Sequence, residues 1–315
     1  MVKFGGRSAR VVCALVVAAL VAVTPAAATA QVVSPTTTSL LPALLDSPNL
    51  TRFDPSSPDA CTAGRPLCLQ NVIKEMIKRS GPLIASCEHN AAFSLLYLRV
   101  TQAIRDHISA DPALFHHADF ITHQDNLFAG MYWRAYDRWQ AGNRAGVPGA
   151  WLIALDAARS KSMPAIGDLY LGINAHVLAD LPVLLYQLGL ADENGASRKP
   201  DHDAVNVVLR DVFEPAIHEL AQRLDPTMSQ SDPLPWTTAD GDVLFQALAG
   251  WREQAWREAE QLAAAPDDAT RTAVFNTLED YATTQALALR AALAYPPLLA
   301  GTQRASRYAY CLAHH

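Results

Sequence analysis

Apolar residues recur at three- and four-residue steps through most of the chain after residue 69, the spacing of one helical face. This pattern predicts helices over residues 69–78, from 83 to about 108, 122–140, 151–160, 164–184, 201–224, 238–264 and 268–294. No alternating strand pattern exceeds a few residues, and no glycine-rich phosphate loop or repeat of fixed period occurs. The expected fold is therefore all-α, a single multi-helix bundle over residues 69–315.

The N-terminal part of the chain has a different pattern. Lys3, Arg7 and Arg10 precede an apolar run over residues 11–23, which is too short for a stable membrane anchor, and small residues follow at 28–30. We expect residues 1–30 to be a signal peptide and the mature protein to be secreted. Residues 31–68 are rich in Pro, Ser and Thr and predict an irregular arm.

Composition and net charge limit the classes of partner that we expect. Half of the residues are apolar, 18% are charged, and the net charge is −6, so nucleic acid is not an expected partner. No second long apolar run follows the first, so no integral membrane anchor is expected in the mature chain. Four cysteines follow residue 30, and of their three possible pairings we favour Cys61 with Cys68 and Cys87 with Cys311.

Polar residues interrupt the apolar faces of several predicted helices. They are His89, Asp125, His176 with Asp180, and His202 with Asn206, each set on a different helix. Burying an unpaired ionisable group is costly, so these groups are expected to meet one another, a metal ion or a trapped water. His176 and Asp180 are four residues apart in the apolar stretch 172–182 and would share one helical face.

This convergence predicts a buried polar pocket in which each residue can be assigned a role. His176 and Asp180 would bind a metal or form a base and its orienting group, while Asp125 or Glu88 would activate water. His89 and His202 would complete a metal site for a divalent ion such as zinc or manganese. Asn174, Asn206 and Tyr132 are the candidate contacts to substrate.

Each candidate also has a purely structural interpretation. Pro182 could start a new helix with Asp180 as its N-cap, and Asp125 could likewise cap a helix. His176 could be a hydrogen-bonded core histidine, and His202 could lie on the surface of a first helical turn. The histidines near the 109–119 break, His116, His117 and His123, are expected to be solvated.

Several stretches carry a family resemblance. They are Trp133/Tyr136/Trp139, Asn174-Ala175-His176 with Asp180-Leu181-Pro182, Asp201-His202 with Asn206, and Trp251-Arg252 with Trp256. Between about Leu83 and Leu262 the chain resembles an actinobacterial family of unknown function, DUF5995. The family name carries no activity; the resemblance implies the helical fold and a site near Asn174–Asp180.

A second similarity rests on His176 and Asp180 alone. In the all-α zinc-dependent phospholipases C and S1/P1-type nucleases, a His-x-x-x-Asp pair on a helix binds zinc; this chain lacks their second such pair. The expected function is a hydrolase-like enzyme, with or without a divalent metal, acting on a small or lipid-like molecule. The alternative is a non-catalytic helical protein that binds a ligand or partner, whose His/Asp network is structural.

Overall fold

The computed structural model describes residues 50–230 and 239–315. The predicted signal peptide and most of the predicted arm lie outside the described residues. Within the two described ranges the chain is helical and contains no strand, which confirms the all-α prediction. A single isolated bridge pairs Ala191 with Ser197 in the loop before residue 199.

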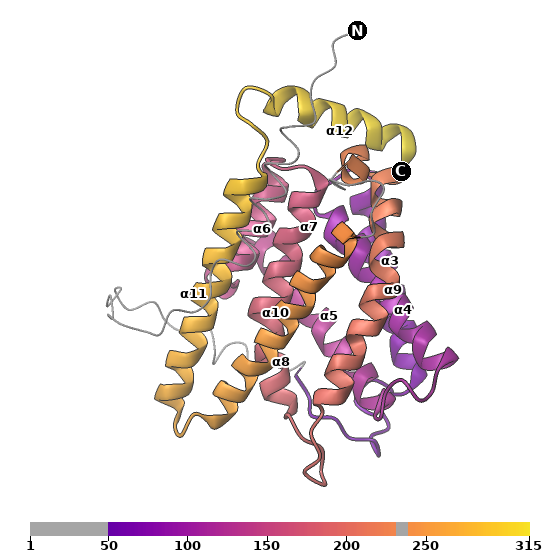
Figure 1. The fold of residues 1–315 in the computed structure, drawn as a ribbon, viewed down its shortest axis with the longest axis vertical. Coiled ribbons are helices and arrows are strands. Elements are labelled where there is room, and N and C mark those ends of the chain that lie inside the picture. Colours follow the sequence, from indigo (N-terminus) through magenta and orange to yellow (C-terminus); the bar gives the residue numbers. More distant parts are fainter. Residues whose placement is uncertain (1–49, 231–238) are drawn as a thin grey trace.

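Long helices run roughly side by side to form the bundle (Figure 1). They are α3 (Pro66–Ala85), α4 (Ala91–Ala110), α5 (Ala118–Gln140), α6 (Gly149–Arg159), α7 (Ala165–Asn174), α8 (Leu181–Leu188), α9 (Lys199–Arg223), α10 (Ala239–Ala264) and α11 (Asp268–Leu293), and α12 (Ala300–His314) lies across one end. Short 3-10 turns at Arg144–Gly146 and Pro226–Gln230 join some of them.

The core of the bundle is the helical run over residues 165–188. It consists of α7, a π-helical segment Ala175–Asp180 (η2) and α8, and it packs against α4, α5, α6, α10 and α11. By length and composition this run could cross a membrane, but 94% of its apolar window is buried inside the protein. Apolar side chains surround it on all sides, which explains the absence of a polar stripe from its sequence.

The helix boundaries differ most from the prediction between α3 and α4. α3 does not end at Ser80-Gly81-Pro82 but continues through Pro82 to Ala85. Pro82 is exposed, so water can satisfy the carbonyl group that loses its amide partner there. The chain turns instead at Cys87, whose φ of 53° is left-handed, and α4 begins only at Ala91.

Two disulfides have the pairings favoured from the sequence. Cys61–Cys68 ties the loop before α3 to the first turn of that helix, and Cys87–Cys311 joins the turn before α4 to α12, 224 residues away. The segment before α3 packs on the bundle through His123, whose ring nitrogens lie 2.8 Å from the Cys61 carbonyl oxygen and 3.0 Å from that of Thr51. The prediction that His123 is solvated was therefore wrong, because its side chain anchors this segment.

Candidate functional site

A cavity of about 90 Å³ opens between α4, α5, the 165–188 run, α9 and α10. Its walls are mainly apolar. The apolar lining consists of Phe93, Leu96, Val100, Ile104, Ile121, Phe128, Ile173, Val177, Leu181, Val205, Leu209, Phe213 and Leu248. The polar lining consists of Tyr97, Gln124, Asp125, His176 and Arg252. Such a site suits a small molecule with an apolar body and a few polar groups.

His176 is held in one orientation by the segment that carries it. Its Nδ1 lies 2.9 Å from Asp180 Oδ2, which also accepts a hydrogen bond of 2.8 Å from the indole N–H of Trp151 on α6. An indole nitrogen only donates, so Asp180 Oδ2 is an acceptor and Nδ1 carries the proton of the neutral ring. Nε2 is then the basic nitrogen, and it has no hydrogen-bond partner among the described residues.

Aromatic rings enclose this imidazole. Phe128 stacks on it with ring centroids 3.5 Å apart, and Tyr97 approaches edge-on at 4.8 Å. The side chain of His176 is 4% exposed. Burial lowers the pKa of His176 below its ordinary value, with Asp180 opposing the change, so the ring is neutral at pH 7.

Asp125 lies inside α5 and is buried, so it does not cap a helix as the structural alternative supposed. Among residues 50–230 and 239–315 its Oδ2 has no hydrogen-bond partner, and burial raises its pKa to about 7. Thr101 opposes this rise, although its hydroxyl forms no hydrogen bond of ordinary geometry. The neighbouring Tyr97 hydroxyl is also unpartnered, and burial together with the charge of Asp125 raises its pKa well above 10.

The π-helical turn explains why Pro182 does not interrupt the buried run. α8 begins at Leu181 with Pro182 in its first turn, where a missing amide costs little. Asp180 occupies the position before that helix, but its side chain forms no capping hydrogen bond. Its carboxylate accepts from His176 and Trp151 instead, so the capping role expected as an alternative was wrong. π-helical turns frequently mark functional sites.

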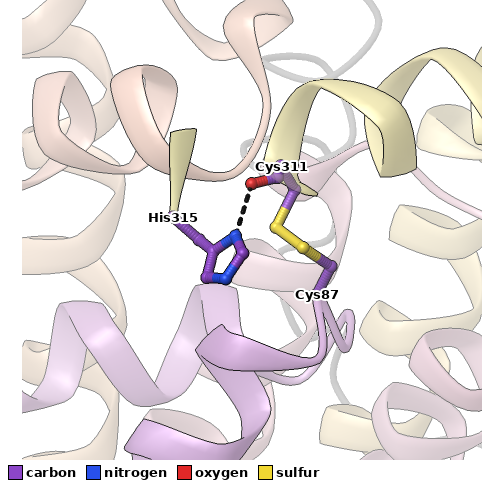
Figure 2. A group of neighbouring side chains, drawn as sticks. All are labelled: Cys87, Cys311 and His315. Carbon is purple, nitrogen blue, oxygen red and sulfur yellow. Dashed lines mark hydrogen bonds between the residues drawn. A yellow bond between two sulfur atoms is a disulfide. The ribbon is translucent and has the colours of Figure 1, made fainter. Parts of the chain in front are cut away.

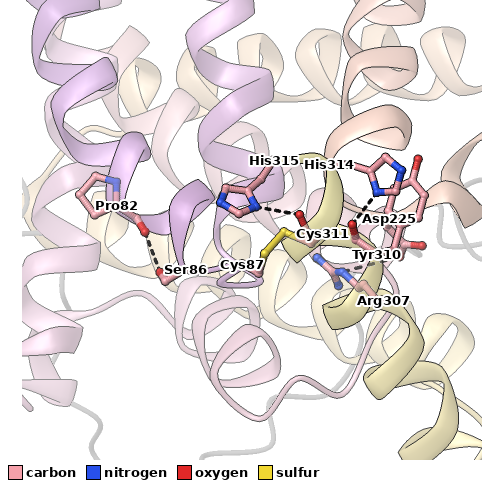
Figure 3. Close-up of a disulfide and its surroundings, with 9 residues drawn as sticks. All are labelled: Pro82, Ser86, Cys87, Asp225, Arg307, Tyr310, Cys311, His314 and His315. Carbon is pink, nitrogen blue, oxygen red and sulfur yellow. Dashed lines mark hydrogen bonds and ion pairs between the residues drawn. A yellow bond between two sulfur atoms is a disulfide. The ribbon is translucent and has the colours of Figure 1, made fainter.

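His89 lies outside this cavity. It sits in the turn before α4, not on a helix, with Nδ1 2.8 Å from Arg307 Nη1 and from Asp168 Oδ2. Arg307 also donates to Asp168 at 2.6 Å. It lies 3.7 Å from Asp225, beside the Cys87–Cys311 disulfide (Figure 3). These groups join α12 to the bundle, because Arg307 is buried with a carboxylate on either side.

His202 is likewise in a separate network, and it is buried, not on the surface. Its Nε2 donates to the Arg252 carbonyl at 3.1 Å, and Arg252 donates back to the His202 carbonyl and to Asn206 Oδ1. Burial and the Arg252 charge lower the pKa of His202 to about 2. The single polar centre expected from the sequence is therefore corrected: His89, His176 and His202 belong to three hydrogen-bond networks, and of these three histidines His176 alone lines the cavity.

The other candidates, Asn174, Tyr132 and Glu88, do not line the cavity. Asn174 is buried and donates to the Ala282 carbonyl, with its own carbonyl oxygen unpartnered. Tyr132 shares a hydrogen bond with Ser94 and stacks on Trp151 behind the cavity wall. Glu88 is half-buried beside the disulfide and does not line the cavity.

The donor atoms needed for a metal ion do not gather at His176. In the described part of the chain, the one group of three His, Cys or carboxylate ligands within 4.8 Å of one another is Cys87, Cys311 and His315 (Figure 2). Its two sulfur atoms form a disulfide and are not thiolate ligands. A metal site built from His176, Asp180, His89 and His202 does not fit this arrangement, since these residues occupy three networks.

Sequence reasoning missed Arg252 and Tyr97 as cavity residues. Arg252 falls in phase with Phe245, Leu248 and Ala255 on the buried face of α10, so a single arginine in an apolar periodicity was the available signal. Tyr97 was counted among the apolar residues of its face. Arg307 gave no local signal, because its partners lie 139 and 218 residues away.

Comparisons with known proteins give a family but no activity. Neither the curated proteins nor the solved structures contain a match to the chain. The similarity to zinc-dependent phospholipases C and S1/P1-type nucleases thus gains no support. A model of a family of unknown function, DUF5995, matches residues 69–292, which include every helix that lines the cavity. The chain belongs to the DUF5995 family.

Proposed function

We propose that this protein binds a small, largely apolar molecule in the cavity and performs hydrolase-like acid–base chemistry on it. One observation carries the proposal: the cavity is lined both by His176, with Nδ1 held by Asp180 and Nε2 unpartnered, and by Asp125, with a pKa of about 7. A neutral imidazole and a half-protonated carboxyl in one cavity supply a base and an acid at the same pH.

In such a reaction His176 is the base. Water attacks the carbonyl carbon of an ester or amide, and its proton passes to Nε2, while Asp180 stabilises the resulting imidazolium through Nδ1. Protonated Asp125 delivers a proton to the leaving group. The unpartnered Tyr97 hydroxyl is available to hold the substrate oxygen. A divalent metal enters no step, because the donor set around His176 does not fit one.

The competing function is ligand binding without catalysis. It is favoured by the apolar lining and by the Phe128 stack, which leaves the imidazole almost inaccessible. In that case the His176–Asp180–Trp151 hydrogen bonds would serve only to satisfy buried polar groups. Both functions predict ligand binding in the cavity, and they differ in whether Nε2 exchanges a proton with the ligand.

The deciding experiment measures turnover of a panel of small esters, amides and phosphoesters, with and without a chelator. We expect ester or amide hydrolysis that the chelator leaves unchanged and that His176→Gln lowers by at least about 100-fold, as for loss of a general base. His116→Gln is the control, since His116 is exposed and away from the cavity. Binding of the same compounds with no turnover would favour the non-catalytic protein.

Export also belongs to this proposal. It is supported by the two disulfides and by the basic start and apolar run of residues 3–23. Mass spectrometry of protein recovered from culture medium should find an N-terminus near Gln31. Recovery of full-length chain from the cytosol alone would contradict export.

A further inference from the structure

The cavity contains a buried cation that forms no ion pair with any described residue. Arg252 is 5% exposed and lines the cavity. Nε donates to the side-chain oxygen of Asn206 at 2.8 Å and Nη2 to the His202 carbonyl at 2.6 Å, both uncharged acceptors. Nη1 donates to no acceptor among the described residues. Two hydrogen bonds thus fix the direction of the guanidinium group and leave a third nitrogen free.

No carboxylate of the described residues neutralises this charge. Asp125 lines the same cavity, but Asp203 and not Asp125 is the carboxylate whose charge acts on Arg252. Asp203 stabilises the charge from a distance, but it is exposed and bonded to Lys199. Burial lowers the pKa of Arg252 to about 10, which reflects the cost of holding a cation away from water.

A buried charge without a counter-ion is costly, and an anionic ligand would remove that cost. The planar guanidinium group matches the geometry of a carboxylate, to which it can donate two parallel hydrogen bonds. Around it the cavity is lined by hydrocarbon and aromatic side chains such as Leu209, Phe213 and Leu248. The ligand that satisfies both features has one carboxylate and an apolar body.

We propose that the cavity binds a small monocarboxylate whose carboxylate pairs with Arg252 and whose apolar body extends between α4, α5 and α9. The inference rests on the proposed function for the cavity as the ligand site. It adds the chemical class of the ligand. The body of the ligand would then lie in the cavity that His176 and Asp125 also line.

The test compares acids with neutral compounds of the same shape on the unmodified protein. Hexanoate and benzoate are titrated by calorimetry against hexanamide and benzamide at pH 7.5. The acids should bind at least about tenfold more tightly than the amides, as expected for a hydrogen-bonded charge pair. Equal affinities of acid and amide, or no binding of any of the four, would overturn the proposal.

Substitutions test whether Arg252 causes the preference for acids. Arg252→Gln should abolish the preference for acids, while Arg257→Gln on the exposed face of the same helix should preserve it. Arg252→Lys, which keeps the charge, should retain part of the preference. A preference that survives Arg252→Gln would overturn the assignment. If Arg252→Gln does not fold, the comparison of acid with amide on the unmodified protein still decides whether the cavity selects an anion.

The outcomes separate this inference from the proposed reaction. Selective binding of acids without hydrolysis of any ester would retain the monocarboxylate ligand and remove the catalytic role of His176. Hydrolysis that depends on His176, together with equal affinity for acids and amides, would retain the enzyme and remove the anion site.

Discussion

Phe128 lies flat on the imidazole ring of His176, with centroids 3.5 Å apart and ring planes 8° from parallel. The two residues come from α5 and from the π-helical turn, so this contact joins a side of the cavity to the buried central run. It covers one face of the imidazole, while Asp180 fixes its edge. The orientation of Nε2 therefore depends on a packing contact as well as a hydrogen bond.

Replacing Phe128 by Leu should loosen the imidazole without removing it. The smaller side chain admits water, so the pKa of His176 should rise toward its ordinary value, because burial is the main cause that lowers it. The free energy of unfolding should fall by about 1–3 kcal/mol. A titration of the imidazole by NMR measures the first effect. An unchanged pKa in a folded variant would show that Phe128 does not shield His176.

Asp180→Asn tests the hydrogen bonds that hold His176. Asn keeps the shape but loses the charge that stabilises an imidazolium, so hydrolysis should fall at least about 100-fold. Stability should fall by about 1–3 kcal/mol, since Trp151 Nε1 and His176 Nδ1 then share a weaker acceptor. The control is Asp106→Asn on the exposed face of α4. Full activity in Asp180→Asn would exclude Asp180 as the orienting group.

The sequence predicted contacts between residues that are close along the chain. The helical periodicity placed Asp125 and His176 on buried faces, and the four-residue spacing paired His176 with Asp180. It failed at His89, because the end of α3 is set by the left-handed turn at Cys87 and not by Pro82. Four cysteines allow three pairings, and the structure contains the pairing that the sequence analysis favoured.

The helical periodicity of the sequence did not predict which residues of distant segments meet. The positions of His89, His176 and His202 relative to one another depend on how α4, α7 and α9 cross. The helical periodicity predicts which face of a helix is buried, but not which helix covers that face. Arg252 shows the same limit, because its bonds to the His202 carbonyl and Asn206 exist only after α10 packs on α9. Burial of a polar residue could be predicted, but a partner on another helix could not.

Gly172 is required by a close approach of α7 to α4. A Cβ atom at this position would lie 2.5 Å from the Phe93 ring, a core side chain that lines the cavity. Gly172→Ala should therefore lower the free energy of unfolding by about 1–3 kcal/mol. Gly130→Ala is the matched control: its Cβ would meet nothing within 4 Å, so it should stabilise α5 by up to about 1 kcal/mol. Urea denaturation of both variants measures the difference, and equal effects would contradict it.

The two disulfides should differ in their contribution to stability. Replacing Cys87 and Cys311 by Ser opens a loop of sequence separation 224 and should cost about 5 kcal/mol in the chain-entropy model. Replacing Cys61 and Cys68 opens one of separation 7 and should cost about 2–3 kcal/mol. Denaturant unfolding of both double variants compares them. A larger loss of unfolding free energy in the Cys61/Cys68 variant would show that chain entropy does not determine which disulfide contributes more to stability.

Asp125 should make the protein less stable as pH rises. Its folded pKa of about 7 lies above the ordinary value of 3.8, so between these pH values the folded state binds more protons than the unfolded state. Stability therefore falls as pH rises through this window, by an amount on the order of 4 kcal/mol for one fully buried group. Glu258 and Glu279, with pKa values also raised to about 7 by burial, add to the slope.

The difference between variants isolates this contribution. Asp125→Asn removes the titrating group, so its unfolding free energy should fall less between pH 4 and pH 8 than that of the unmodified protein. Asp106→Asn, which also removes one carboxylate, should keep the original slope because Asp106 is exposed. Urea unfolding at half-unit pH steps gives the three profiles. Parallel profiles for Asp125→Asn and the unmodified protein would mean that Asp125 is ionised in the fold and cannot supply the proton to a leaving group at neutral pH.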